Sequence, residues 1–206
     1  MGGAPPCRNE WSRMTRAAGI ASDDALLVLF ANGDRHAAQE LTQRLSPRAF
    51  AVAMRVLGNH AEAEDITQDA MMRLWRMAPE WRQGEAQVST WLYRVVMNLC
   101  LDRKRRVRGG SVGLDAIPEP EDPAASVTDR MQDSARWDAL QAGLMQLPDR
   151  QRQAVVLRHI EELSNPEIAE VMDISVEAVE SLTARGKRAL AKALADQREE
   201  LGYSDG

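Results

Sequence analysis

The chain has 206 residues, enough for one large domain or two small ones, and 44% of them are apolar while only 4% are aromatic. Leu, Val, Ile, Met and Ala must therefore form the cores, and the many helix-forming residues favour an all-helical fold. The net charge of -5 argues against indiscriminate nucleic-acid binding. The sequence contains no run of about 18 apolar residues, so no membrane span is expected.

The start of the chain, residues 1–21, is rich in Gly, Pro and Arg and lacks the apolar segment of a secretory signal. We expect it to be a disordered lead-in, within which Met14 is an alternative first residue. The two cysteines, Cys7 and Cys100, are too few for a disulfide framework, so a reduced, cytoplasmic setting is expected. Cys100 falls in a predicted helix, where a packing role is favoured over a redox-sensing one.

Hydrophobic periodicity predicts a first helical unit over residues 22–108. Gly33 and Gly58 mark turns between helices. Ser46 followed by Pro47 has the composition of an N-cap with proline at the first helical position, so a break between two helices is predicted there. The predicted helices of this unit cover residues 25–31, 35–45, 47–57, 61–77 and 90–108.

The next segment, residues 109–133, holds three prolines and six acidic residues against one basic residue, and it has no helical period. We interpret it as a flexible acidic linker to a second unit over residues 134–200, which is followed by a tail at 201–206. No strand pattern occurs in the sequence. The predicted architecture is therefore all-α, with two small helical domains joined by the linker.

The second unit contains the pattern of a helix-turn-helix. Ser164 and Glu167 have capping-box spacing at the start of a short helix, and Ser175 is placed to cap a longer one. Asp173 occupies the turn between them and tolerates the left-handed conformation. The second helix of such a motif reads the major groove, and the basic residues along it favour DNA binding, although an ordinary helical hairpin gives the same pattern. These basic residues are Arg185, Lys187, Arg188 and Lys192.

The predicted helix 90–108 begins with Trp91 and Tyr93 and ends in a cluster of Arg and Lys. Rings can stack on single-stranded bases while cations hold the phosphates, so this helix is a candidate for single-strand binding. A core helix with a solvated charged end is an equal alternative. Trp75 is interpreted as core, whereas Trp81 lies in the preceding polar loop and stays a functional candidate.

The predicted helix 61–77 has a mixed-charge face opposite its apolar stripe. A solvated face is the simpler interpretation, and a docking surface for another helix is the alternative. This face consists of Asp65, Asp69, Met72, Arg73 and Arg76.

Catalytic patterns are missing from the sequence. His36, His60 and His159 are scattered, and none belongs to a set of residues with metal-ligand spacing. The chain has no phosphate loop, nucleophile elbow or dinucleotide motif. We therefore expect no enzyme activity, no catalytic residue, no metal and no cofactor.

Taken in order, three segments resemble the extracytoplasmic-function (ECF, group IV) sigma factors of bacterial RNA polymerase. The family segment that docks on the coiled coil of the polymerase's largest subunit resembles residues 61–76, AEAEDITQDAMMRLWR. The segment that captures the minus-ten element resembles residues 89–106, STWLYRVVMNLCLDRKRR. The domain that reads the minus-thirty-five element resembles residues 147–190, LPDRQRQAVVLRHIEELSNPEIAEVMDISVEAVESLTARGKRAL.

The resemblance covers about residues 22–195 and implies a dissociable promoter-specificity subunit. The first unit corresponds to sigma region 2 and the second to sigma region 4. The implied partners are core RNA polymerase, promoter DNA and an anti-sigma factor that holds the protein inactive.

The resemblance also assigns three sets of residues. RNA polymerase binding is assigned to Asp65, Gln68, Asp69, Met72, Arg73 and Arg76. Minus-ten DNA binding, with a flipped base held in the loop 81–90, is assigned to Trp81, Arg82, Trp91, Arg94, Asn98, Lys104, Arg105, Arg106 and Arg108. Minus-thirty-five DNA binding is assigned to Ser175, Glu177, Ala178, Glu180, Ser181, Arg185, Lys187 and Arg188.

The second unit departs from the family pattern at Glu177, Glu180 and Leu182. Phosphates repel carboxylates, although a glutamate can accept a hydrogen bond from cytosine. Because residues 136–206 hold 9 basic and 13 acidic residues, we expect weak, selective minus-thirty-five binding, with the acidic linker keeping free protein off DNA. Two alternatives remain: a sigma-like decoy that sequesters an anti-sigma factor, and a helix-turn-helix regulator that binds only duplex DNA.

Overall fold

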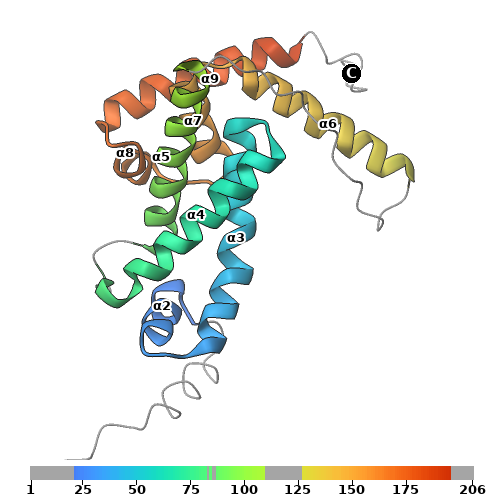
Figure 1. Ribbon diagram of the computed structural model, residues 1–206. Coiled ribbons are helices and arrows are strands. Elements are labelled where there is room, and N and C mark those ends of the chain that lie inside the picture. The colour runs from blue at the N-terminus through green and yellow to red at the C-terminus, as the bar shows by residue number, and fades with distance from the viewer. Residues whose placement is uncertain (1–20, 83, 85–86, 110–126, 196–206) are drawn as a thin grey trace, which may run out of the picture.

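The computed structural model describes residues 21–82, 84, 87–109 and 127–195, and within these ranges every regular element is a helix, as predicted (Figure 1). The first unit comprises α2 (Asp23–Ala31), α3 (Arg35–Leu57), α4 (His60–Met77), the short 3-10 helix η1 (Ala78–Glu80) and α5 (Val88–Gly109). The second comprises α6 (Val127–Gln146), α7 (Asp149–His159), α8 (Asn165–Met172) and α9 (Val176–Ala195). No helix in these ranges is both long and apolar enough to cross a membrane.

Polar caps fix where the helices of the first unit begin. The side chains of Ser22, Asp34 and Asn59 accept hydrogen bonds from backbone N–H groups in the first turns of α2, α3 and α4. These N–H groups have no partner within their own helix, so each cap removes an unsatisfied donor. At the other end of α3, Gly58 takes the left-handed conformation with φ of 70° and stops the helix.

The break predicted at Ser46 is wrong, because α3 runs without interruption through Pro47. A proline inside a helix removes one hydrogen bond and costs about 3 kcal/mol. Pro47 itself is exposed, while Leu45 and Ala49 on either side of it belong to one buried stripe along the helix. Burial of this stripe offsets the cost of the proline.

Helix α6 begins at Val127, so residues 127–133, which were expected in the linker, are helical. The last proline of the acidic segment is Pro123, and nothing after it prevents the backbone N–H groups from entering a helix. The remainder of the expected linker, residues 110–126, lies outside the described residues.

The helix-turn-helix of the second unit has the predicted local geometry. Ser164 and Glu167 form a complete capping box at the start of α8. Asp173 ends α8 in the left-handed conformation with φ of 52°, and Ser175 accepts a hydrogen bond from the backbone of Ala178 at the start of α9. The turn therefore needs no glycine, because a short polar side chain tolerates this conformation.

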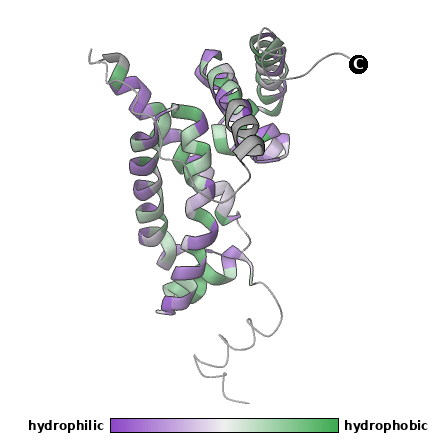
Figure 2. Ribbon diagram, turned by 90° about the vertical axis from the view of Figure 1, so that its right-hand side faces the viewer, coloured by the Kyte–Doolittle hydropathy of each residue, from purple (hydrophilic) through white to green (hydrophobic). Residues whose placement is uncertain are grey.

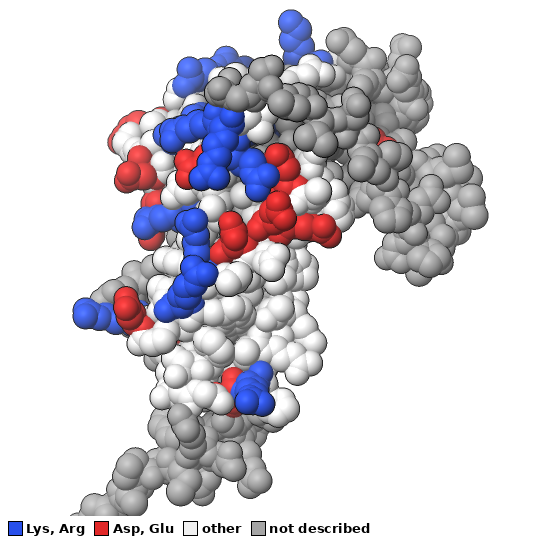
Figure 3. Space-filling view, viewed as in Figure 1, with Lys and Arg blue, Asp and Glu red and all other residues white. Residues whose placement is uncertain are grey.

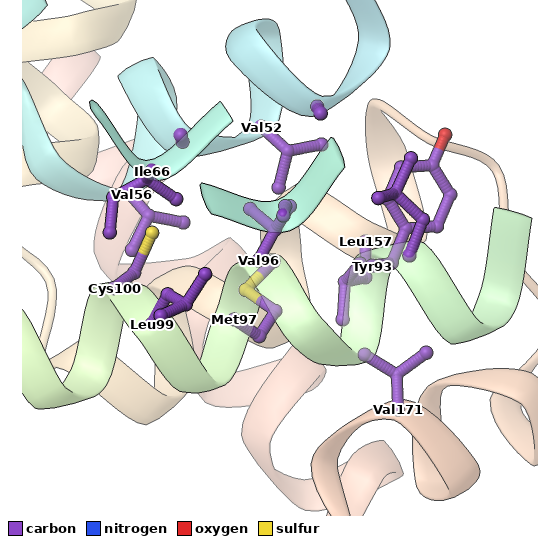
Figure 4. Close-up of a cluster of buried hydrophobic side chains, with 14 of the residues drawn as sticks. Val52, Val56, Ile66, Tyr93, Val96, Met97, Leu99, Cys100, Leu157 and Val171 are labelled. Carbon is purple, nitrogen blue, oxygen red and sulfur yellow. The ribbon is translucent and has the colours of Figure 1, made fainter. Parts of the chain in front are cut away.

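One buried apolar cluster runs through both units. Helices α5 and α8 pack side by side, and side chains of α3, α4 and α5 meet Leu157 of α7 and Val171 of α8 (Figure 4). Both residues are at most 1% exposed, and burying each contributes roughly 1.5–3 kcal/mol. The helices alternate hydrophobic and hydrophilic residues (Figure 2), as helices with one buried face do. The two units thus share a core, which the sequence did not predict.

Candidate functional site

The mixed-charge face of α4 is open to solvent. All six side chains assigned to polymerase binding are exposed, and Met72 is 44% exposed. A large apolar side chain that is only partly packed within the chain leaves apolar surface available to a partner. The six exposed residues are Asp65, Gln68, Asp69, Met72, Arg73 and Arg76.

A groove lies between α3 and α4 beside Met72. Its apolar lining comes from Phe50, Met71, Met72 and Trp75, and Gln68 is among its polar residues. Trp75 is half-buried and packs on Phe30, with ring centroids 4.7 Å apart, so its ring forms a fixed wall. An amphipathic helix could place an apolar side chain in this groove. Trp75 is therefore part of the core, as predicted, and also lines the groove.

Arg73 lies on the other flank of α4. It lines a crevice of about 440 Å³ between α4, α5 and the second unit, together with Asn98 and Arg105 of α5 and Arg150 of α7. The crevice brings one residue assigned to polymerase binding beside two assigned to the minus-ten strand.

Two cations of α5 assigned to the minus-ten strand are bonded to the second unit. Lys104 Nζ lies 2.8 Å from Asp149 Oδ1, and both side chains are less than one-fifth exposed. Arg94 donates to the backbone oxygen of Glu170 at 2.8 Å and 3.1 Å, and Arg94 Nη2 lies 3.4 Å from Glu170 Oε1. The second unit therefore covers part of the face that the sequence assigned to DNA.

Glu161, just after α7, sits at the centre of the same junction. Its Oε2 atom accepts a 2.6 Å hydrogen bond from the hydroxyl of Tyr93, and its Oε1 atom lies 3.9 Å from Arg55 Nη1. The guanidinium of Arg55 also stacks over Trp137, 5.0 Å from the ring centroid. Burial, followed by the bond to Glu161, raises the pKa of Tyr93, and burial lowers the pKa of Arg55.

The ring of Tyr93 is therefore not accessible for stacking on a base while the two units are in contact. It is 5% exposed, and its ring belongs to the shared core (Figure 4). The interpretation that paired it with Trp91 as a base-stacking aromatic is corrected by this burial. Trp91 is partly buried against the same core.

The carboxyl end of α3 is joined to the second unit through its backbone oxygens. Arg152, only 3% exposed, donates to the backbone oxygen of Val56 at 2.8 Å, and Gln141 donates to that of Met54 at 3.0 Å. The last carbonyls of a helix lack partners within the helix, so Arg152 satisfies the oxygen of Val56, while Gln141 is a second donor to the oxygen of Met54, which also accepts from the Gly58 N–H. Arg152 also binds carbonyls at the end of α6, those of Leu144, Met145 and Leu147.

The loop assigned to the flipped base is described only in part, because residues 83, 85 and 86 lie outside the described residues. Trp81 is partly buried, and its indole donates to Asp24 of α2 at 3.0 Å. Arg82 is exposed. Trp81 is thus held against the first unit rather than projecting freely.

The remaining basic side chains of α5 lie toward its carboxyl end. Arg105 and Arg106 are exposed, and Arg105 lies 3.6 Å from Asp102. Asn98 is exposed as well. The side chain of Arg108 is not among those that the structure describes. Figure 3 shows Lys and Arg gathered over the upper part of the molecule, with Asp and Glu among them.

The residues assigned to the minus-thirty-five element share the amino-terminal two-thirds of α9. All are exposed except Ala178, which is partly buried: Ser175, Glu177, Ala178, Glu180, Ser181, Arg185, Lys187 and Arg188. Glu180 accepts a hydrogen bond from Asn165 of α8 at 3.4 Å. Hydrogen bonds from its own backbone and from Ser175 lower the pKa of Glu177. The helix therefore presents anionic and cationic groups together.

Among the described residues, no group of three His, Cys, Asp or Glu side chains could hold a metal ion. Cys100 is fully buried, and burial raises the pKa of its thiol to about 12. Because the thiolate is the reactive form, this position favours packing over redox sensing.

Sequence reasoning missed the junction between the units. Asp149, Arg152, Glu161 and Glu170 looked like ordinary charged positions of a helical domain, and none was singled out. The only signal was the acidic balance of the second unit, which suggested repulsion of DNA but not a partner within the chain.

The chain is similar to known proteins along most of its length. The chain matches the family models of sigma-70 region 2 over residues 41–109 and sigma-70 region 4 over residues 137–190. It is 32% identical to the ECF RNA polymerase sigma factor SigW of Bacillus subtilis, across 80% of this chain and 92% of that protein. Its structure is similar to that of CnrH in complex with the cytosolic domain of CnrY, with 25% identity, a TM-score of 0.62 and coverage of 85% and 99%. It also resembles RpoE in complex with the anti-sigma factor NepR from Bartonella quintana, with 21% identity, a TM-score of 0.60 and coverage of 76% and 96%.

Proposed function

Because the chain belongs to the ECF RNA polymerase sigma factors, which direct RNA polymerase to promoters, we propose how its faces divide that work. The exposed face of α4 binds core polymerase, α5 and the loop before it hold the minus-ten strand, and α9 contacts the minus-thirty-five duplex. The observation that carries this proposal is the open α4 face beside an apolar groove.

The chemistry of α4 suits a helical partner. Met72 and the groove wall at Trp75 offer apolar contact, while Asp65, Asp69 and Arg76 offer charges of both signs around it. An apolar centre with a polar rim is the common anatomy of a protein–protein interface. We assign the centre of the contact to Met72.

The chemistry of α5 suits a single strand. Arg94 and Lys104 are ten residues apart, a span of about 15 Å along the helix. Cations at that spacing can hold more than one phosphate, while Asn98 between them can reach a base edge. Trp81, Arg82, Trp91, Arg105, Arg106 and Arg108 complete the proposed strand-binding set.

The helix α9 suits selective and weak duplex binding. Arg185, Lys187 and Arg188 can contact phosphates, whereas Glu177 and Glu180 repel them. Promoter choice therefore rests mainly on the first unit.

Run-off transcription with purified core polymerase and a promoter library tests the whole proposal. Transcripts that initiate only when the chain is added are the expected result. A decoy or a duplex-only regulator would give none, so the absence of transcripts together with undetectable polymerase binding overturns the proposal.

The face of α4 is tested by binding of core polymerase to the variant Asp69→Asn/Met72→Ala. Removal of a central contact residue costs about 2 kcal/mol, so binding should weaken roughly 30-fold. The matched control, Asp138→Asn/Val107→Ala, also removes one carboxylate charge and shortens one exposed apolar side chain, at positions outside the face. Equal binding by both variants would reject the assignment.

We also propose that an anti-sigma factor controls this chain in the cytoplasm, as RpoE was solved with its anti-sigma factor NepR. The cognate anti-sigma factor should abolish run-off transcription, and excess chain should restore it. Transcription that persists with a saturating anti-sigma factor would contradict this part of the proposal.

A further inference from the structure

The junction between the units places carboxylates of the second unit against the cations of the first. Three acidic residues from separate parts of the second unit take part: Asp149 at the start of α7, Glu161 just after α7, and Glu170 in α8. They face Lys104, Arg55 and Arg94 in turn. The charges are therefore complementary across the junction.

Two of the cations assigned to the minus-ten strand are bonded to oxygen atoms of the second unit. Lys104 is bonded to the carboxylate of Asp149, and Arg94 is bonded to the backbone oxygen of Glu170. The Lys104 ammonium has three N–H donors and the Arg94 guanidinium has five, so bonds to Asp149 and Glu170 compete with bonds to a DNA backbone. The second unit presents to α5 the same chemistry as a nucleic-acid strand.

The three contacts differ in strength. Arg94 and Glu170 are 43% and 48% exposed, so solvent screens this pair and it contributes little. Asp149 and Glu161 are 13% and 11% exposed, so solvent screens their contacts across the junction less, and Asp149 also lies 3.5 Å from Arg152 of its own helix. Among the charged contacts, those of Asp149 and Glu161 therefore contribute most to closure, beside the apolar core that the units share.

The junction is also imperfectly satisfied, as a contact that must reopen would be. Arg55 Nε and Gln141 Oε1 are buried without a hydrogen-bond partner among the described residues. Each such group costs about 1–3 kcal/mol, which lowers the free energy needed to separate the units. Polar contacts between domains are typical of interfaces that can move, and here they accompany the apolar core that the two units share.

We propose that the acidic face formed by Asp149, Glu161 and Glu170 is an internal partner of α5 that excludes DNA from the free chain. The strand can bind only after this face is displaced. The inference rests on the proposed role of α5 in strand binding, and it moves the inhibition from the acidic linker to the folded second unit.

The test uses the full chain and the variant Asp149→Asn/Glu161→Gln. Donor and acceptor dyes at Gln39→Cys in α3 and Ala191→Cys in α9, both exposed, report the separation of the units in a Cys7→Ser background. Anisotropy of a dye-labelled DNA single strand of random sequence reports binding. The matched control, Asp138→Asn/Glu162→Gln, removes the same charges at exposed positions away from the contacts.

The variant should show lower energy transfer and bind the strand about tenfold more tightly than the control, since two partly buried pairs are lost. Glu161→Gln alone leaves the first turn of α7 intact and should give a smaller change in the same direction. Circular dichroism checks that the variants are folded.

Unchanged energy transfer in both folded variants would overturn the proposal, because the carboxylates would not hold the units together. Lower energy transfer with strand affinity equal to the control would overturn it too, because the second unit would not compete with DNA. Failure of the proposed function is distinct: the unaltered chain would then yield no transcripts with core polymerase.

Discussion

The faces of α4 and α5 belong to the same unit, but they differ in how far the second unit contacts them. On α4, the residues assigned to polymerase are exposed. On α5, Arg94 and Lys104 are engaged by Glu170 and Asp149 of the second unit. The difference shows that one chain can leave its proposed polymerase-binding surface exposed while part of its proposed DNA-binding surface is bonded to the second unit. Polymerase binding would then come first and strand binding second.

The physical reason lies in what each face offers to its own chain. The α4 face mixes acidic and basic side chains around Met72, so the acidic second unit finds no single sign of charge to pair with. Arg94 and Lys104 of α5 both contact the second unit, where Arg94 is bonded to the backbone oxygen of Glu170 and Lys104 to the carboxylate of Asp149. The same cations that suit phosphates therefore suit Asp149 and Glu170.

The largest expected effect comes from removing the buried guanidinium of Arg152, which joins the second unit to α3. Arg152→Met loses bonds to Val56 and to three carbonyls at the end of α6, and should lower the free energy of unfolding by at least about 3 kcal/mol. Urea denaturation measures this. Arg150→Met, an exposed position in the same helix, is the control and should cost less than about 1 kcal/mol. Similar losses in both would show that the buried bonds do not support the junction.

A smaller effect is expected where α3 meets α6. Gly58 has φ of 70°, and a Cβ there would lie 2.8 Å from Met145 Sδ. Gly58→Ala should therefore lower the free energy of unfolding by about 1–2 kcal/mol, chiefly through the left-handed backbone, and push α6 away. Gly33→Ala shares the positive φ but is exposed at the end of α2. Both variants should lose stability, and only Gly58→Ala should reduce the energy transfer between the dyes. If Gly33→Ala reduced the energy transfer as well, the effect of Gly58→Ala could not be assigned to the junction.

The smallest expected effect is the pH dependence of the capping box that positions α8 and its Glu170. The hydrogen bond from Ser164 lowers the pKa of Glu167 below 4.5, so this contribution is present above pH 4.5 and is lost as pH falls through the lowered pKa. Ser164→Ala should cost about 1 kcal/mol at neutral pH and less in acid, measured by urea denaturation at both. Ser22→Ala removes the serine cap of α2 as a control. If Ser164→Ala lowered the free energy of unfolding equally at neutral and acid pH, the bond between Ser164 and the Glu167 carboxylate would not contribute.

The local structure could be predicted because its causes are local. Ser164 with Glu167, Asp173 and Ser175 predicted the helix-turn-helix, and each has the predicted role. Pro47 was misjudged because its local preference for a helix start was outweighed by burial of Leu45 and Ala49, which depends on distant helices. The position of each candidate residue on α4, α5 or α9 was likewise readable from the helical period.

By itself, the sequence determined the helices, their order, the helix-turn-helix and the family. It did so because caps, turns and apolar stripes act over a few residues. Only the tertiary structure decided that Arg94 and Lys104 of α5 are engaged by the second unit while the α4 face is exposed, and that Tyr93 binds Glu161 68 residues away. Charge complementarity between distant helices depends on their packing in space, and no spacing along the chain reveals it.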